Sequence, residues 1–346
     1  MPDLPPQSFG RAVVAGASPT FRRAVAVLLA LWLTAILPAV GRDAPVEDTS
    51  LGDFLKTQGY ATVPLRHGIG PHLEVAAKIN GVGGRFLVDT GAQITVVDAH
   101  SLRKFRLTSV KTGVRVIGAV GGPGERIEAA LAGNLRLGPC ESSPFLLGVS
   151  DLGALNQGRP RGGGPFDGII GADVLQNFGI VIDCAGLQLH ARRSSSGAAR
   201  GLGSFLAGYG YRDVPMKRSS ISDFEVVANV NKRRVLWLVD TGAAITLLDA
   251  TVSRKAGVKL KKTNFTVGGA GGGRRRIDIG IVDNLKLSSV QMGSAVIAAS
   301  DISVNAALNE PGKVPIDGYL GADFLREKHA VIDCAQMHLY LRGRGR

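Results

Sequence analysis

Two nearly identical strings, "LVDTGAQIT" at residues 87–95 and "LVDTGAAIT" at residues 238–246, lie in the two halves of this 346-residue chain. Each string places Asp-Thr-Gly at the end of a short apolar run. A single copy is a weak signal, because turns that combine an acidic residue with glycine are common. Two copies with matching flanks indicate a duplicated structural unit.

A second pair of matching elements supports the duplication. "DGIIGAD" at residues 167–173 recurs as "DGYLGAD" at residues 317–323, 150 positions later, and the Asp-Thr-Gly copies are 151 positions apart. This near-constant spacing predicts two lobes of the same anatomy. We expect a signal peptide or membrane anchor, a short leader or pro-segment, a first lobe, a linker and a second lobe, at residues 1–41, 42–58, 59–190, 191–207 and 208–346.

The pattern within each lobe is typical of β-strands. "EVAAKI" (74–79) and "FEVVANV" (224–230) alternate apolar residues with polar or small ones, and glycines separate the apolar runs. Helical patterns are limited to short pieces such as "ADVLQNF" (172–178) and "ADFLREK" (322–328). The fold class is therefore mainly β, and short strands with many glycines favour a barrel-like β lobe.

Each residue type in Asp-Thr-Gly suits a catalytic loop. The aspartate supplies a carboxylate, and the threonine hydroxyl can form hydrogen bonds across an interface between the lobes. The glycine permits a close backbone approach where a Cβ would clash. We therefore expect the two loops to meet and to bring Asp89 and Asp240 together.

This pattern resembles the aspartic peptidases, both the bilobal pepsin-like enzymes and the retropepsin-like dimers. The resemblance covers about residues 60–341 and rests on the "VDTGA" and "DG-apolar-apolar-GAD" elements. It implies two homologous β-barrel lobes related by a pseudo-two-fold axis, with a catalytic cleft between them. It assigns catalysis to Asp89 and Asp240, and support of the loops to Thr90, Gly91, Thr241, Gly242, Gly171 and Gly321.

The resemblance also implies the reaction, hydrolysis of peptide bonds in an extended polypeptide without a cofactor. Two adjacent carboxylates cannot both ionise cheaply, so they share one proton. The ionised carboxylate takes a proton from a water molecule, and the protonated one donates to the scissile carbonyl. The sequence does not assign the proton to either aspartate, since the pair titrates as a unit.

Two glycine-rich stretches follow the catalytic loops at matching distances. They are "VIGAVGGPGERI" (116–127) and "FTVGGAGGGRRRI" (265–277). They are either ordinary glycine-rich hairpins or, as in the retropepsin-like dimers they resemble, flaps that close over substrate. The flap interpretation predicts substrate contacts from Gly118, Val120, Gly121, Gly122, Gly269, Ala270 and Gly271.

The charge and composition of the chain exclude few classes of function. The net charge is +13, but aromatic residues make up only 5% of the chain, so we expect a solvated basic surface and no nucleic-acid partner. The histidines are scattered and no Cys-x-x-Cys occurs, so we expect no metal site. Cys184 and Cys334 are expected to be small buried apolar side chains, and the state of Cys140 is left open.

The segment at residues 22–40 begins with Arg22 and Arg23 and continues as an apolar run. It is typical of a signal peptide cut after Gly41, or of an uncut anchor in the inner membrane. Either interpretation predicts an exported body, periplasmic or secreted, associated with the membrane if the anchor is kept.

Three alternatives to a single-chain endopeptidase stay open. The protein could be a catalytically silent relative that binds peptides, or a basic protein that binds an anionic polymer. A lobe could also pair with a lobe of another chain, whereas we expect a monomer that is an intramolecular pseudo-dimer.

The residue after each Asp-Thr-Gly is alanine, at positions 92 and 243. Alanine has no hydroxyl to donate to the carboxylate and lower its pKa. We therefore predict highest activity at mildly acidic to near-neutral pH, to be measured as a pH–rate profile. An optimum at about pH 3 or below would contradict this expectation.

Overall fold

The computed structural model describes residues 49–68, 70–116, 125–157, 164–192, 199–218, 224–268, 274–302 and 316–342. The predicted leader at residues 1–41 lies outside these ranges. None of the helices within them has the length and apolar character that a membrane span requires. The fold is mainly β, as predicted, and its strands form three sheets.

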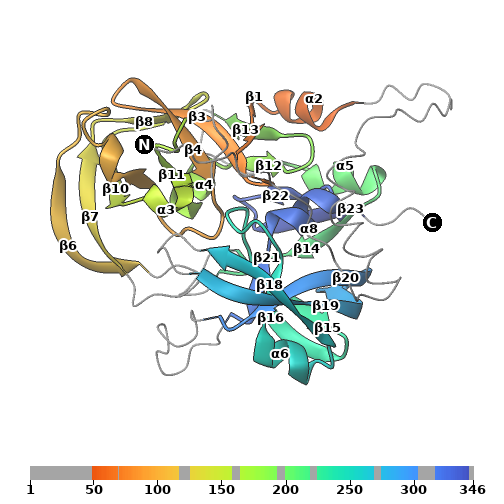
Figure 1. Ribbon diagram of the computed structural model, residues 1–346. Helices are drawn as coiled ribbons and strands as arrows, with labels where there is room; N and C mark the ends of the chain where they lie inside the picture. The colour runs from red at the N-terminus through yellow and green to blue at the C-terminus, as the bar shows by residue number, and fades with distance from the viewer. Residues whose placement is uncertain are drawn as a thin grey trace, which may run out of the picture. The chain divides into compact units, whose positions relative to one another are not determined.

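The first lobe is built on a 10-stranded sheet (Figure 1). Its order is β6-β7-β10-β5-β11-β4-β3-β8-β9, and β2 also pairs with β3. The strands are β2 (Arg66–His67), β3 (Leu73–Ile79), β4 (Val82–Val88), β5 (Val96–Asp98), β6 (Ser109–Val116), β7 (Glu125–Ala132), β8 (Leu135–Leu137), β9 (Cys140–Ser142), β10 (Phe145–Ser150) and β11 (Gly168–Ile170). The last three residues of β4 are all buried, which explains the continuous apolar run before Asp89.

The second lobe repeats this arrangement in a seven-stranded sheet of order β15-β16-β21-β17-β20-β19-β18. An additional pairing of β15 with β19 closes six of these strands into a barrel. The strands are β15 (Glu225–Val230), β16 (Arg233–Val239), β17 (Leu247–Asp249), β18 (Leu260–Gly268), β19 (Arg274–Leu287), β20 (Val290–Ser300) and β21 (Gly318–Leu320). In both lobes the strand of the Asp-Gly element runs parallel to the strand that ends at Asp-Thr-Gly.

The two lobes share the third sheet, which has six strands in the order β1-β13-β12-β22-β23-β14. The strands are β1 (Tyr60–Pro64), β12 (Val181–Asp183), β13 (Gln188–Arg192), β14 (Tyr211–Pro215), β22 (Val331–Asp333) and β23 (His338–Arg342). Three strands come from each lobe, and β12 pairs antiparallel with β22 at the centre, where Ile182 lies opposite Ile332. The lobes are therefore joined by backbone hydrogen bonds as well as by side-chain packing.

Two short helices cover this shared sheet. They are α2 (Leu51–Lys56) and α5 (Leu202–Gly208), and their rings Phe54 and Phe205 stack at 4.2 Å between centroids. Their sequences, "LGDFLK" and "LGSFLAG", are themselves a repeat that starts 151 positions apart. Each predicted connecting segment, 42–58 and 191–207, therefore contains residues of a helix that belongs to the folded body.

The remaining helices of the described residues are short. They are the 3₁₀ turn η1 (Ala99–Ser101) and the α-helices α3 (Gly153–Gln157), α4 (Ala172–Asn177), α6 (Ala250–Lys255) and α8 (Ala322–Glu327). The predicted helical pieces after the Asp-Gly elements correspond to α4 and α8. All three cysteines are free and buried, so the expectation for Cys184 and Cys334 is confirmed.

The packing of α2 generates a stability prediction. Leu55 is fully buried in a cluster with Tyr60 and residues of α5, β12 and β22. Replacing Leu55 by alanine should lower the free energy of unfolding by about 3 kcal/mol, because a large side chain leaves a cavity. Urea unfolding of the purified chain measures this, with the exposed Lys56→Ala as control. Equal stability of the two variants would contradict a structural role for the packing of α2.

Candidate active site

The candidate site is formed where β4 and β16 end. Each strand gives way to an Asp-Thr-Gly loop as its apolar run stops, at Asp89 and at Asp240. The amide of Asp89 donates to the carbonyl of Ile170 at 3.0 Å, and the amide of Asp240 donates to that of Leu320 at 3.0 Å. The start of each loop is therefore fixed to the strand of its own Asp-Gly element.

The two carboxylates meet across the lobe boundary and interact through a side-chain hydrogen bond. Oδ1 of Asp89 also accepts from the amides of Gly91 and Ala92 at 2.8 and 3.1 Å. Oδ1 of Asp240 accepts from the amides of Gly242 and Ala243 at 2.8 and 3.0 Å. Each carboxylate is therefore oriented by its own loop.

Burial governs the protonation of the pair. It raises the pKa of both carboxyl groups above the ordinary aspartate value, and the negative charge of Asp89 raises the pKa of Asp240 further. Amide donors from each loop partly oppose this rise. The pair can hold one proton between two oxygens at a pH where exposed aspartates are ionised.

The two threonines join the loops reciprocally. The Thr90 hydroxyl donates to the carbonyl of Val239 at 2.7 Å, and the Thr241 hydroxyl donates to the carbonyl of Val88 at 2.8 Å. Each hydroxyl also accepts the amide of the other threonine at 3.0 Å. Both threonines are buried, so all four hydrogen bonds are shielded from water.

The loop glycines are required by the close approach of the opposite aspartate. A Cβ on Gly91 would lie 2.6 Å from Cγ of Asp240, and one on Gly242 would lie 2.3 Å from Cγ of Asp89. Such distances are far inside van der Waals contact. Each glycine therefore makes room for the carboxylate of the other lobe.

Gly171 and Gly321 lie behind the loops, as the resemblance implies. A Cβ on Gly171 would lie 2.6 Å from the backbone of Ile94, and one on Gly321 would lie 2.4 Å from that of Ile245. The following amides, of Ala172 and Ala322, donate to loop carbonyls at 2.8 Å in both lobes. These elements support the loops through the backbone.

A second pair of supports was missed in the sequence, although it is part of the repeat. The Thr95 hydroxyl accepts the amide of Gly171 at 3.0 Å and donates to Asp173 at 2.7 Å. The Thr246 hydroxyl accepts the amide of Gly321 at 3.0 Å and donates to Asp323 at 2.8 Å. The signal was present in the threonine of "DTGAxIT" and the aspartate of "GAD".

One residue near the pair has no equivalent in the repeat pattern. Nε2 of the partly buried His72 lies 2.8 Å from the carbonyl oxygen of Gly242, in the loop of the other lobe. His72 also interacts electrostatically with Asp89. In the sequence His72 is one of several scattered histidines without a pattern, because this contact joins residues 170 positions apart.

Asp98, His100 and Asp151 form a cluster that could hold a cation. Asp98 also has a structural role, since its carboxylate accepts the amides of His100 and Leu152. The equivalent Asp249 accepts the amides of Thr251, Val252 and Ile302 without any histidine. The repeat therefore indicates a structural role for Asp98, which caps the 3₁₀ turn η1 and anchors the loop at Leu152.

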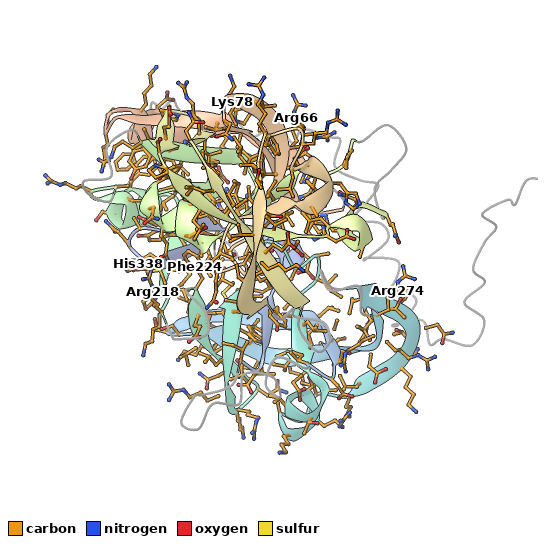
Figure 2. The ribbon with its side chains drawn as sticks, turned by 90° about the vertical axis from the view of Figure 1, so that its left-hand side faces the viewer. Arg66, Lys78, Arg218, Phe224, Arg274 and His338 are labelled. Carbon is orange, nitrogen blue, oxygen red and sulfur yellow. The ribbon has the colours of Figure 1, made fainter. Side chains whose placement is uncertain are left out.

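Basic side chains lie on several separate elements. Arg66 and Lys78 in the first lobe and Arg274 in the second are exposed (Figure 2). A hollow of about 540 Å³ is lined by Lys232, Arg233, Arg234, Lys255 and Ala256. It adjoins the start of β16, whereas Asp240 follows the end of that strand.

The seven predicted flap residues lie outside the part of the chain that the structure describes.

The threonine network predicts a difference between two substitutions. Thr241→Val keeps the shape but removes the hydroxyl, leaving the Val88 carbonyl and the Thr90 amide buried without that partner. We expect it to lower the free energy of unfolding by about 3 kcal/mol. Thr241→Ser keeps the hydroxyl and should lower the free energy of unfolding by about 1 kcal/mol or less. Denaturant unfolding measures both, and equal losses would contradict the structural role of the hydroxyl.

Comparisons with known proteins identify the family of the chain. Residues 75–174 and 226–324 match the family described as Aspartyl protease, and these segments together cover more than half of the chain. Among solved structures, a retropepsin-like aspartic protease from Rickettsia conorii is similar at 20% sequence identity and a TM-score of 0.27, over 39% of this chain and 91% of that one. No curated protein sequence matches the chain. Both halves match one family, and the chain belongs to the aspartyl proteases.

Proposed function

We propose that this protein is an aspartic endopeptidase that hydrolyses peptide bonds of extended polypeptides with Asp89 and Asp240. The observation that carries the proposal is the meeting of two carboxylates, the partly buried Asp89 of the first lobe and the buried Asp240 of the second, which interact through a side-chain hydrogen bond. Family membership supports a peptidase. The reciprocal threonine bonds support a rigid pair, which catalysis by positioned groups requires.

The proposed reaction uses one proton and one water molecule. The ionised carboxylate takes a proton from the water while the oxygen of the water attacks the scissile carbonyl carbon. The protonated carboxylate gives its proton to the carbonyl oxygen, which yields a neutral tetrahedral diol. Breakdown of the diol transfers a proton to the leaving nitrogen and releases an acid and an amine. The enzyme forms no covalent bond to substrate.

We also propose that both glycine-rich hairpins act as flaps. The described strands pair up to the glycine-rich tips, with Val116 opposite Glu125 in β6–β7 and Gly268 opposite Arg274 in β18–β19. Gly118, Val120, Gly121, Gly122, Gly269, Ala270 and Gly271 would then contact substrate through their backbones. Equivalent placement of the hairpins in the two sheets supports a pair of flaps over one cleft.

A monomer is the proposed working form, because one chain holds both aspartates. Export, with the segment at residues 22–40 as signal peptide or membrane anchor, remains a proposal from the sequence. If the protein were a catalytically silent relative that only binds peptides, the presence of an intact Asp-Thr-Gly loop in both lobes would need another explanation. A protein that binds an anionic polymer would use basic surface such as the hollow at Lys232–Arg234, and its binding would not depend on Asp89.

The proposal predicts that neither aspartate can be replaced. Asp89→Asn and Asp240→Asn should each lower cleavage of a denatured protein substrate at least about 1,000-fold, because the shared proton and the base are lost together. The assay is run between about pH 4 and pH 7, the mildly acidic to near-neutral range in which we predict the highest activity.

Both variants should keep the cooperative unfolding transition of the wild type, since asparagine is nearly isosteric with aspartate. Cleavage by either folded variant at the wild-type rate would refute the proposed function.

A further inference from the structure

The hollow beside the start of β16 lies far from the catalytic pair. Its volume is about 540 Å³, and it is lined by Lys232, Arg233, Arg234, Lys255 and Ala256. Because β16 has seven residues, the hollow is roughly 20 Å along this strand from Asp240. The helix α6, which ends at Lys255, lies at the end of the second lobe farthest from the shared sheet (Figure 1). A ligand in the hollow therefore does not touch the catalytic carboxylates.

The two walls of the hollow are fixed to each other. One wall is the turn between β15 and β16, which consists of Asn231 and Lys232, and the other is the end of α6. The side-chain amide of Asn231 donates to the carbonyl of Ala256 at 2.8 Å and so joins the walls. The side-chain oxygen of Asn231 accepts the amides of Asp283 and Asn284 at 3.2 Å. The backbone that carries the basic residues is thus preorganised for a ligand.

The first lobe has the same scaffold without these charges. The side-chain amide of Asn80 donates to the carbonyl of Phe105 at 2.9 Å, in the same way as Asn231 in the second lobe. Lys255 corresponds to Lys104, whose Nζ lies 2.7 Å from a carboxylate oxygen of Asp167. The three basic residues at the turn correspond to uncharged ones, Gly81, Val82 and Gly83. The hairpin therefore forms without basic residues, and its fold does not explain the cations of the second lobe.

The positive charge of the hollow is not neutralised nearby. Among the described residues, no ion pair joins any of its four basic side chains to a carboxylate. Arg233 interacts with the charge of Asp317 only at longer range. Like charges around one hollow repel one another, and a concave wall focuses their field on an anion. An anion with several charges relieves this repulsion best.

We propose that the hollow is a binding site for a multivalent phosphate, separate from the catalytic pair. The planar guanidinium groups of Arg233 and Arg234 match phosphate oxygens in pairs, and the ammonium groups of Lys232 and Lys255 add point charges. A carboxylate carries one negative charge, whereas a phosphate monoester carries up to two. The volume lies within the range of about 300–1,000 Å³ that is typical of small-ligand sites, so it admits linked phosphates or a phosphorylated headgroup.

Binding of inorganic tripolyphosphate to the full chain, measured by isothermal titration calorimetry, tests the site. Lys232→Gln combined with Arg234→Gln removes two charges from the hollow. Arg66→Gln combined with Lys78→Gln is the matched control, because it removes two exposed charges from the first lobe (Figure 2). We expect the hollow variant to bind at least about 10-fold more weakly than the wild type, and the control to stay within about twofold of it.

Equal weakening in both double variants would mean attraction to the net charge of the chain alone, and would overturn the proposal. The absence of saturable binding by the wild type would overturn it too. Urea unfolding checks that each variant is folded. Lys255→Gln, on the other wall, should weaken binding at least about threefold and makes the test independent of the turn.

Vesicles distinguish a lipid headgroup from a free phosphate. The measured quantity is binding to vesicles that contain phosphatidic acid, in excess of binding to pure phosphatidylcholine vesicles. If the hollow variant loses this excess and the control keeps it, the ligand is a lipid headgroup. If both keep it, the ligand is a free phosphate. Given hollow-dependent binding of tripolyphosphate, either result supports the site and identifies its source.

The catalytic pair provides the last control. Asp89→Asn should bind tripolyphosphate as the wild type does, because the hollow is remote from the pair. Loss of binding in this variant would place the ligand at the catalytic site and would overturn the proposal. None of these measurements depends on peptide cleavage, so the failure of the proposed function and the failure of this inference are distinguishable.

Discussion

The architecture depends on the four hydrogen bonds that Thr90 and Thr241 make across the lobe boundary. Each hydroxyl both donates to a carbonyl and accepts an amide of the opposite lobe, so each loop satisfies buried polar groups of the other. Because the bonds are buried, breaking them leaves polar groups without water. This constraint brings the two aspartates together.

The rest of the molecule keeps the two loops in register. The shared six-stranded sheet joins the lobes through β12 and β22, and the stacked rings of Phe54 and Phe205 lie on the helices that cover it. Gly171 and Gly321 let the supporting backbone approach each loop closely. A displacement of one lobe would therefore strain the sheet, the helices and the loops together.

A duplicated chain can also differ between its halves, which a symmetric dimer of identical chains cannot. Ile169 of the first lobe corresponds to Tyr319 of the second, and His72 corresponds to Asp223. The charge of Asp240 contributes to the raised pKa of the buried Tyr319, after burial itself, and Nε2 of His72 lies 2.8 Å from the carbonyl oxygen of Gly242.

Much of this could be predicted from the sequence, because a repeat fixes equivalent positions without any knowledge of distances. The mainly β fold, the lobes and the meeting of the aspartates followed from it. The helices α2 and α5 were missed because six or seven residues carry little periodicity, although "LGDFLK" and "LGSFLAG" repeat. His72 could not be found, since its hydrogen bond depends on how the folded lobes meet and leaves no local pattern.

The most direct test of two lobes completing one site within a single chain is complementation. Asp89→Asn and Asp240→Asn chains are unfolded together, refolded as a mixture and assayed beside wild-type protein treated in the same way. Each chain then carries one damaged loop in its own pair, so the account predicts no recovery of cleavage at any mixing ratio. Recovery of a substantial fraction of wild-type activity would show that lobes of different chains form the site, and would contradict it.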